Sequence, residues 1–429
     1  MLTLDQFLAR LDGIRAMPDR LAGLRALQAF EAELRSGGLT STALLLFSAR
    51  YAGFGAFNDS RRCVDDLLVL GQSQPAAIEH ALRGVGNLFA MYGQGDERLV
   101  ERALPFAARK LREDPGNADA MMVALMGSFY ADRWSVFARL RRRYLRANAM
   151  GANSDNAFVH FIGMCEPNWA AIADGAAGDG SGTGLLSCSP PTGASPTGPL
   201  VATACDGIYW RHFGDIALAS LRAVEPHRHF HAHVVDPDEA TLAQLRALAA
   251  DDPAFSFAVQ STAPAGRLVS DPKVRKAYYS CARFIALESQ LVAFRQPMLL
   301  VDVDIRFRRS LAPYFQEVAG GGPRATRHVR VTPWFDFGAG FCFVEPDGAG
   351  FAFANAMRRY ILDRILAGQA HWHLDQIAMY FVDRSLFQGG GGIRGESYMI
   401  SRRYLHFAGQ FIGALSLEDK RRQMLAAAW

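Results

Sequence analysis

The sequence PMLLVDVDI occupies residues 297–305, where an apolar run ends at two aspartates separated by one residue. A short apolar run of this kind predicts a buried β-strand. Side chains at i and i+2 of a strand point the same way, so Asp302 and Asp304 should face one side as the strand leaves its sheet. Two carboxylates there supply half of a Mg²⁺ or Mn²⁺ site, with other positions left for water and phosphate oxygens. The plain alternative is a surface turn capped by aspartates.

Three similar runs precede this segment: LVATACDG at 200–207, HFHAHVVD at 229–236 and FSFAVQST at 255–262. Stretches with helical spacing, beginning near Arg211, Glu239 and Lys273, separate the four runs. Strands that alternate with helices predict an α/β fold with a mixed, mainly parallel sheet covered on both faces. In such sheets ligands bind at the carboxyl ends of the strands, which is where the two aspartates lie.

The first 150 residues have helical apolar spacing almost throughout, and two segments repeat each other. They are QPAAIEHALRGVGNLFAMY at 74–92 and DPGNADAMMVALMGSFYAD at 114–132. Their alignment superposes three pairs of large apolar residues: Leu82 with Met122, Val85 with Leu125, and Phe89 with Phe129. This pattern predicts an all-α scaffold domain over residues 1–165. A tetratricopeptide-type repeat and an ordinary helical bundle remain open as its form.

Residues 174–199 are rich in Gly, Ser and Pro and poor in large apolar side chains. Such a segment buries too little surface to offset its ordering entropy, so we expect a linker there. It separates the helical domain from a second domain over residues 200–429.

The composition excludes several classes of protein. The six cysteines form no CxxC pair, which favours reduced thiols over a disulfide framework or a structural zinc. No segment approaches the roughly 20 apolar residues of a membrane span. Asp5 and Asp12 in the opening segment are unlike a signal peptide, so we expect a cytoplasmic protein without a transmembrane segment.

The net charge is only +4 on 429 residues, and its densest cluster is the arginines between residues 139 and 146. No stacking aromatics are interleaved with them, which favours a solvated helix face over nucleic-acid binding. An anionic acceptor or a lipid surface remains open as a partner of this cluster.

Six segments of the second half occur in an order that resembles one enzyme family. They are VATACDGIYWRHFGDIALASL from Val201, YYSCARFIAL from Tyr278, the DVD triplet, FDFGAGFCFVEPD from Phe335, HLDQIAMY from His373 and YLHFAG from Tyr404. Over about residues 200–410 the chain resembles glycosyltransferase family 8, which includes glycogenin and lipopolysaccharide galactosyltransferases.

The resemblance implies a Rossmann-like GT-A fold and a hexosyltransferase that uses Mn²⁺, or Mg²⁺, and a nucleotide-sugar donor, usually a UDP-sugar. Retention of configuration at the sugar is also implied. The acceptor is unknown: a glycan, a lipid-linked glycan or a protein would each serve. The helical domain is expected to recruit the acceptor or a protein partner, and no nucleic acid is expected.

The resemblance also assigns roles by position. Asp302, Asp304 and His406 would bind the metal, and Thr203, Asp206 and Tyr209 would lie by the nucleoside. Asp375 and Gln376 would face the reacting carbon of the sugar, and Gly409 would let the backbone approach the diphosphate.

Arg283 matches the arginine of the helix that precedes the metal motif. Asp336 stands where the family has Asn, which leaves the donor sugar open. Some of these residues also have a plain role: Asp375 would cap a helix, and His406 would pack in the fold.

One departure concerns the diphosphate. The family commonly carries a Lys after its His-Phe-x-Gly segment, whereas Ile412 occupies that position here. A cation for the phosphates must come from Arg394, Arg402, Arg403 or Arg283, or be absent.

Two other functions remain open. The first is an interaction protein whose transferase domain is inactive. The second is a phosphohydrolase of the haloacid dehalogenase type, in which the first Asp of LLVDVD is the nucleophile. That fold places its motif on the first strand and needs a later acidic pair. Here three strands come first and Asp251–Asp252 lies upstream, so we rank it below the transferase.

Overall fold

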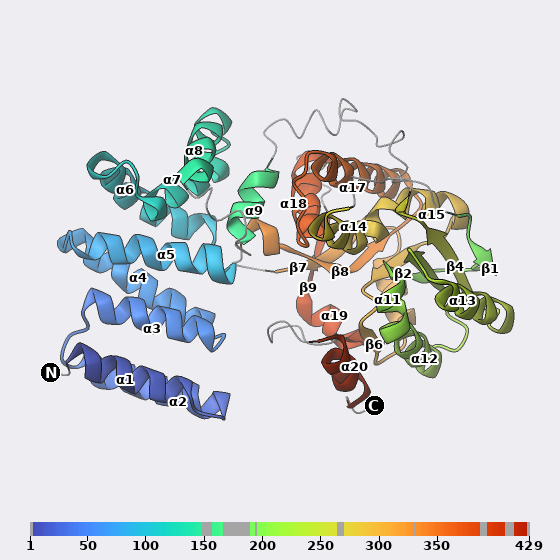
Figure 1. The fold of residues 1–429 in the computed structure, drawn as a ribbon, viewed down its shortest axis with the longest axis horizontal. Coiled ribbons are helices and arrows are strands. Elements are labelled where there is room, and N and C mark those ends of the chain that lie inside the picture. Colours follow the sequence, from blue (N-terminus) through green and yellow to red (C-terminus); the bar gives the residue numbers. More distant parts are fainter. Residues whose placement is uncertain are drawn as a thin grey trace. The chain divides into compact units, whose positions relative to one another are not determined.

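The computed structural model describes residues 3–147, 157–165, 189–193, 195–263, 270–328, 332–386, 393–407 and 416–426. The chain forms two compact units (Figure 1). The first comprises Met1–Ile162 with Arg330–Thr332, and the second comprises Gly163–Val329 with Pro333–Trp429.

The first unit is built from helices that pack against their neighbours in sequence. They are α1 (Leu4–Arg15), α2 (Arg20–Arg35), α3 (Ser41–Gly53), α4 (Phe57–Ser73), α5 (Ala77–Tyr92), α6 (Glu97–Glu113), α7 (Ala118–Tyr130) and α8 (Trp134–Ala147), and α9 (Ala157–Met164) follows in the chain. The predicted all-α region is confirmed. The six apolar residues aligned between the repeated segments lie on α5 and α7 and are all buried. A repeat and a bundle would both bury them, so the repeat remains a prediction.

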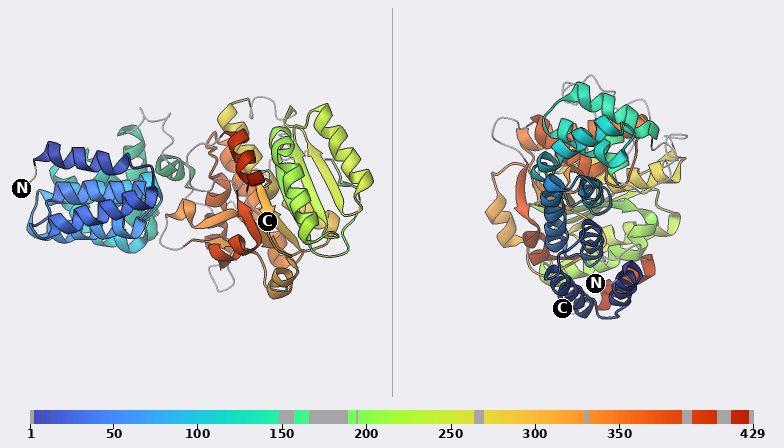
Figure 2. Two further views of the ribbon diagram at one scale, coloured as in Figure 1. Left: turned by 90° about the horizontal axis from the view of Figure 1, so that it is seen from below. Right: turned by 90° about the vertical axis from the view of Figure 1, so that its left-hand side faces the viewer.

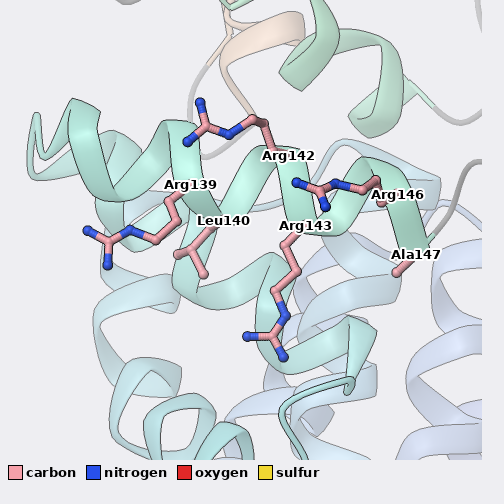
Figure 3. Close-up of a pocket in the computed structure, with 6 residues that line it drawn as sticks. All are labelled: Arg139, Leu140, Arg142, Arg143, Arg146 and Ala147. Carbon is pink, nitrogen blue, oxygen red and sulfur yellow. The ribbon is translucent and has the colours of Figure 1, made fainter.

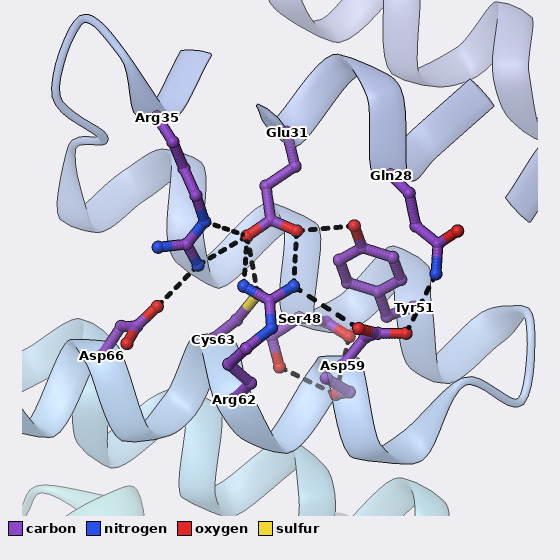
Figure 4. A network of polar contacts seen from close by, with 10 residues as sticks. Gln28, Glu31, Arg35, Ser48, Tyr51, Asp59, Arg62, Cys63 and Asp66 are labelled. Carbon is purple, nitrogen blue, oxygen red and sulfur yellow. Dashed lines mark hydrogen bonds and ion pairs between the residues drawn. The ribbon is translucent and has the colours of Figure 1, made fainter. Parts of the chain in front are cut away.

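A carboxylate is buried in this unit, on α2. Glu31 accepts hydrogen bonds from both Nη atoms of Arg62, at 2.8 and 2.7 Å, and from the Tyr51 hydroxyl at 2.6 Å (Figure 4). Arg35, one turn along α2, completes the set at 2.8 Å. Burial alone would raise the pKa of Glu31, but these hydrogen bonds outweigh it and lower the pKa to about 2. Glu31 therefore ties α2 to α3 and α4 through charged hydrogen bonds.

We expect Glu31→Gln to destabilise the helical unit by about 2 kcal/mol, because it removes hydrogen bonds between charged groups in a buried position. Urea denaturation followed by circular dichroism would measure the change. Glu33→Gln is the matched control, since Glu33 lies on the same helix in an exposed ion pair with Arg10. Equal effects of the two substitutions would contradict the structural role of Glu31.

The second unit contains an eight-stranded sheet within the described residues, ordered β1-β4-β3-β2-β5-β8-β7-β9. Its strands are β1 (Thr192–Gly193), β2 (Leu200–Asp206), β3 (Phe230–Val235), β4 (Phe255–Gln260), β5 (Met298–Val301), β7 (Arg324–Arg327), β8 (Phe337–Val344) and β9 (Arg394–Ser397). The central strands β4, β3, β2 and β5 run parallel, whereas β8 is antiparallel to both β5 and β7. The predicted α/β class with a mixed, mainly parallel sheet is confirmed.

Helices cover both faces of this sheet (Figures 1 and 2). On one face α14 (Pro272–Ile285) contacts β2 and β3, and it also packs on α17 (Gly348–Leu366) and α18 (Leu374–Leu386). On the other face η2 (Trp210–Gly214), α12 (Asp215–Val224) and α16 (Ala312–Val318) share one apolar core with side chains from β2, β3, β5 and β8. The strands are buried on both faces as a result, which explains their nearly continuous apolar sequences.

The remaining elements lie around this core. They are α11 (Gly207–Tyr209), α13 (Glu239–Asp251), α15 (Leu287–Phe294), η4 (Pro333–Phe335), α19 (Tyr398–Tyr404), α20 (Leu417–Ala426) and a separate pair of strands, β6 (Ile305–Phe307) with β10 (Leu405–Phe407). None of the helices in the described ranges combines the length and apolar character needed to span a bilayer.

The end of the expected linker belongs to the sheet. Thr192 and Gly193 form β1 and pair with β4, and Ser189 exchanges hydrogen bonds with Val259 at 2.7 and 2.9 Å. Backbone pairing at a sheet edge requires no apolar side chains, so composition did not reveal it. Residues 174–188 and 194 lie outside the described part of the chain.

Three buried histidines lie on β3 or, for His229, directly before it. The Ser256 hydroxyl is shared by His229 Nε2 at 2.7 Å and His231 Nδ1 at 3.0 Å, and His233 Nε2 pairs with the Gln260 side chain at 2.8 Å. Burial lowers the pKa of all three, and that of His229 falls to about 4. The folded protein therefore holds these rings neutral, whereas the unfolded chain protonates them near pH 6.5.

Because the unfolded state binds more protons, these histidines should make the protein less stable as the pH falls below 6.5. We expect His231→Leu to reduce the pH dependence of the unfolding free energy by up to about 1.4 kcal/mol per pH unit below pH 6.5. Ser256 keeps His229 as a partner in this variant. Denaturant titrations at several pH values would measure the slope, and an unchanged slope would show that His231 is not buried as a neutral ring.

Candidate active site

The two aspartates of the DVD triplet lie at the carboxyl end of β5, between β5 and β6. Strand β2 runs parallel to β5, with Thr203 beside Val301. The carboxyl ends of both strands therefore open at the same edge of the sheet. This edge brings together Asp206 from the end of β2 and Asp302 and Asp304 from the end of β5.

Arg283 links one of these aspartates to a residue far along the chain. It lies near the end of α14 with only 6% of its surface exposed. Its Nη1 bonds to Asp302, and its Nη2 donates to Asp375 Oδ2 at 2.9 Å. The structure thus joins three predicted site residues from three elements.

Asp375 is buried in the first turn of α18. Burial raises its pKa to about 6, with the Arg283 charge opposing the rise. The neighbouring Gln376 is half-buried and donates its backbone N–H to the Asp375 carboxylate at 2.8 Å. One Asp375 oxygen therefore accepts a backbone N–H in the first turn of α18, as the capping role predicts, and the other binds Arg283. The expected place of Asp375 beside the reacting carbon of the sugar stays a prediction.

Asp304 has a different cationic partner, on α20. Lys420 Nζ donates to Asp304 Oδ2 at 2.9 Å and lies 5.7 Å from the centre of the Tyr209 ring. Burial raises the pKa of Asp304 and the Asp302 charge adds to the rise, while Lys420 opposes both. The sequence did not predict Lys420 as a site residue, because LEDKRRQMLA has the charge density of an ordinary surface helix.

The nucleoside side of the predicted site lies at the end of β2. Asp206 caps α11 by accepting the backbone N–H of Tyr209 at 2.8 Å. Thr203, three residues earlier, is buried, and its Oγ1 has no hydrogen-bond partner within the described residues. Thr203 thus lies on the strand that ends at Asp206, and Tyr209 follows on α11.

A second residue that sequence analysis missed lies at the end of β3. Asp236 has a φ of 48° and accepts hydrogen bonds from the Thr262 backbone at 2.8 Å and the Tyr279 hydroxyl at 2.9 Å. A Cβ on Gly207 would lie only 3.0 Å from Pro237 Cα, so a larger residue would push the ends of β2 and β3 apart by a few tenths of an ångström. An aspartate at a strand end was a weak sequence signal because it also suits a turn.

Two predicted residues lie in other surroundings. Asp336, just before β8, forms a two-point ion pair with Arg327 at 3.1 and 3.0 Å. His406 lies on β10 opposite Arg306 of β6, and therefore on the strand paired with the continuation of the DVD triplet. Burial and the charges of Arg308, Arg306 and Arg402 lower its pKa. Gly409 and Ile412 lie outside the described residues.

Asp302 and Asp304 are the hard oxygen ligands that Mg²⁺ and Mn²⁺ prefer, and they converge at one strand end. Across the described ranges, no set of three or more His, Cys, Asp or Glu side chains is placed to hold a metal ion. The chemistry of the two carboxylates suits the expected cation, and metal binding by Asp302, Asp304 and His406 remains a prediction.

The four arginines that were considered as cations for the phosphates differ in their exposure to solvent. Arg394 on β9 and Arg402 and Arg403 on α19 are exposed, and Arg283 is occupied by its two aspartates.

A hollow of about 700 Å³ lies along α8 in the helical unit (Figure 3). Its lining consists of Arg139, Leu140, Arg142, Arg143, Arg146 and Ala147. Among the described residues this lining contains no carboxylate, histidine or nucleophile, and so we place the candidate chemistry in the α/β unit.

Comparisons with known proteins give a limited result. No family model and no curated protein matches the chain. Among solved structures, the galactosyltransferase LgtC in complex with donor and acceptor sugar analogues is 15% identical, with a TM-score of 0.34 over 52% of this chain and 82% of LgtC. The bifunctional glycosyltransferase WbbM is 13% identical, with a TM-score of 0.33 over 48% of this chain and 40% of WbbM. Mouse xyloside xylosyltransferase 1 is 15% identical, with a TM-score of 0.30 over 44% of this chain and 82% of that enzyme. Scores this low leave the function to be argued from the site.

The buried ion pairs of Arg283 lead to a stability prediction. We expect Arg283→Met to destabilise the protein by about 3–5 kcal/mol, because it leaves the buried Asp375 and its neighbour Asp302 without their shared cation. Asp302→Asn should cost less, since Asp302 is partly exposed and the amide still accepts a hydrogen bond. Denaturant titration followed by near-UV circular dichroism would measure both. An Arg283→Met protein as stable as the unaltered one would contradict the ion pairs described here.

Proposed function

We propose that this protein is a metal-dependent glycosyltransferase that moves a hexose from a nucleotide diphosphate, a UDP-sugar for preference, to an acceptor hydroxyl. The observation that carries the proposal is the cluster at the carboxyl edge of the sheet. Asp302 and Asp304 both follow the end of β5, and Arg283 forms ion pairs with Asp302 and Asp375. Asp206 lies at the end of the neighbouring parallel strand, β2.

The leaving group explains why such a site needs two acidic residues at one strand end. Departure of a nucleoside diphosphate concentrates negative charge on its β-phosphate. A divalent cation held by Asp302 and Asp304, with His406 as the predicted third ligand, supplies charge stabilisation there when bound. The protein's own contribution is to hold the two carboxylates in place, and Arg283 does so for Asp302.

The sugar would lie on the Asp375 side of this cluster. A carboxylate and an amide beside the reacting carbon stabilise an oxocarbenium-like centre and orient the acceptor, as in glycosidases. Asp375 and Gln376 are adjacent at the start of α18, and Arg283 bonds both Asp375 and Asp302. The family resemblance favours retention of configuration.

The nucleoside would lie at the ends of β2 and β3. Asp206 and Tyr209 offer a carboxylate and an aromatic ring there, and Thr203 offers a buried hydroxyl without a partner among the described residues. Asp336, ion-paired with Arg327, is assigned to donor selection through the family position alone. The helical unit is proposed to recruit the acceptor or a protein partner, in the cytoplasm.

A thermal-shift screen of UDP-, GDP- and ADP-sugars with and without Mn²⁺ would test the proposal, because a ligand that binds only the folded state raises its melting temperature. We expect one nucleotide-sugar to stabilise the protein only with metal and to be hydrolysed slowly. Asp304→Ala should abolish both effects. Glu418→Gln, which alters an exposed carboxylate near Lys420 in sequence, should leave both unchanged.

Other outcomes would favour the rival functions. Lack of binding and turnover across the whole panel would indicate an inactive interaction protein. Phosphate release from an aryl phosphate that is lost in Asp302→Asn would instead indicate a phosphohydrolase.

A further inference from the structure

Helix α20 places a lysine in the candidate site although it lies more than one hundred residues beyond the DVD triplet. Lys420 Nζ bonds Asp304, and its side chain is only 23% exposed. The neighbouring Tyr209 ring lies below the ammonium group at 5.7 Å from its centre. A lysine side chain is rarely buried to this extent without a partner of opposite charge.

Residues on either side of Lys420 fix the helix to the α/β core. Arg421 forms a two-point ion pair with Asp215 at 3.0 and 2.9 Å and also bonds the backbone of His212. One turn later, the Met424 side chain is fully buried in the core and its carbonyl accepts a hydrogen bond from Arg306 at 2.6 Å. These anchors hold α20 against η2 and β6, and thereby hold Lys420 at the site.

A diphosphate brings negative charge to a site that already contains Asp302, Asp304 and Asp375. Besides the proposed metal ion, the cations that contact these acids in the described part of the chain are Arg283 and Lys420. Arg283 is buried between its two aspartates, whereas Lys420 contacts a single carboxylate and is partly exposed. An ammonium on a flexible four-carbon chain can turn from a carboxylate to a phosphate oxygen while its helix stays in place.

We propose that Lys420 binds the diphosphate of the nucleotide donor, and so supplies from α20 the cation that the sequence lacks at Ile412. This inference rests on the proposed function. It assigns Lys420 to the phosphates and leaves the base and ribose to the ends of β2 and β3. Removal of the ammonium should therefore weaken binding of a nucleoside diphosphate without weakening binding of the nucleoside alone.

The full-length protein would be titrated with UDP and with uridine in the presence of Mn²⁺, by calorimetry for UDP and ligand-observed NMR for uridine. We expect Lys420→Met to weaken UDP binding roughly 10- to 100-fold, as for loss of one charged hydrogen bond, and to leave uridine binding unchanged. Lys420→Arg should restore most of the UDP affinity. Arg422→Met is the matched control, because it removes the same charge from the same helix at a side chain that is 79% exposed.

Several results would overturn the inference. Unchanged UDP affinity in Lys420→Met would do so, and so would an equal loss for UDP and uridine, which indicates that Lys420 only supports the shape of the site. The same loss in Arg422→Met would indicate a general charge effect. If Lys420→Met fails to fold, Lys420→Gln replaces it in the same titrations. Failure of the unaltered protein to bind UDP would instead contradict the UDP donor of the proposed function, and the inference with it.

Discussion

The ion pairs of Arg283 are the constraint on which the candidate site depends. A guanidinium is planar and always charged, so it can bond two carboxylates in fixed directions at once. Here those carboxylates are Asp302 at the end of β5 and Asp375 at the start of α18. The buried Asp375 would be costly to keep as an anion without a cation, and Arg283 would be equally costly to bury alone. The three residues therefore determine one another's positions and, with them, how α14, β5 and α18 meet.

The sheet makes this arrangement accessible to a ligand. Its central strands are parallel, so their carboxyl ends lie along one edge, and the acidic residues that follow β2, β3 and β5 gather there. Both faces of the strands are covered by helices, which leaves this edge as the place where polar groups can meet solvent. The same geometry favours a glycine at Gly207, since a Cβ there would lie 3.0 Å from the backbone that follows β3.

Sequence patterns were sufficient for the parts of the fold that depend on local periodicity. The four apolar runs became β2, β3, β4 and β5 with ends within one or two residues of those expected, because each is buried on both faces. The aspartates of the DVD triplet were visible since they interrupt such a run. Strand β1 was not visible, because its residues contribute only backbone hydrogen bonds to the sheet. Asp236 was not singled out either, since its importance lies in partners from α14 and from the segment after β4 that only the fold brings to it.

Lys420 shows the limit of reasoning from local pattern most clearly. Residues 418–422 around it are five consecutive charged residues, and an ordinary solvated helix contains such runs as well. Its three basic residues have different surroundings in the structure: Arg421 anchors the helix, Arg422 points to solvent, and Lys420 reaches Asp304. What separates them is the rotation of α20 against the core, which the buried Met424 and the ion pair of Arg421 with Asp215 set together. This rotation determines which cation faces the acids that follow β5.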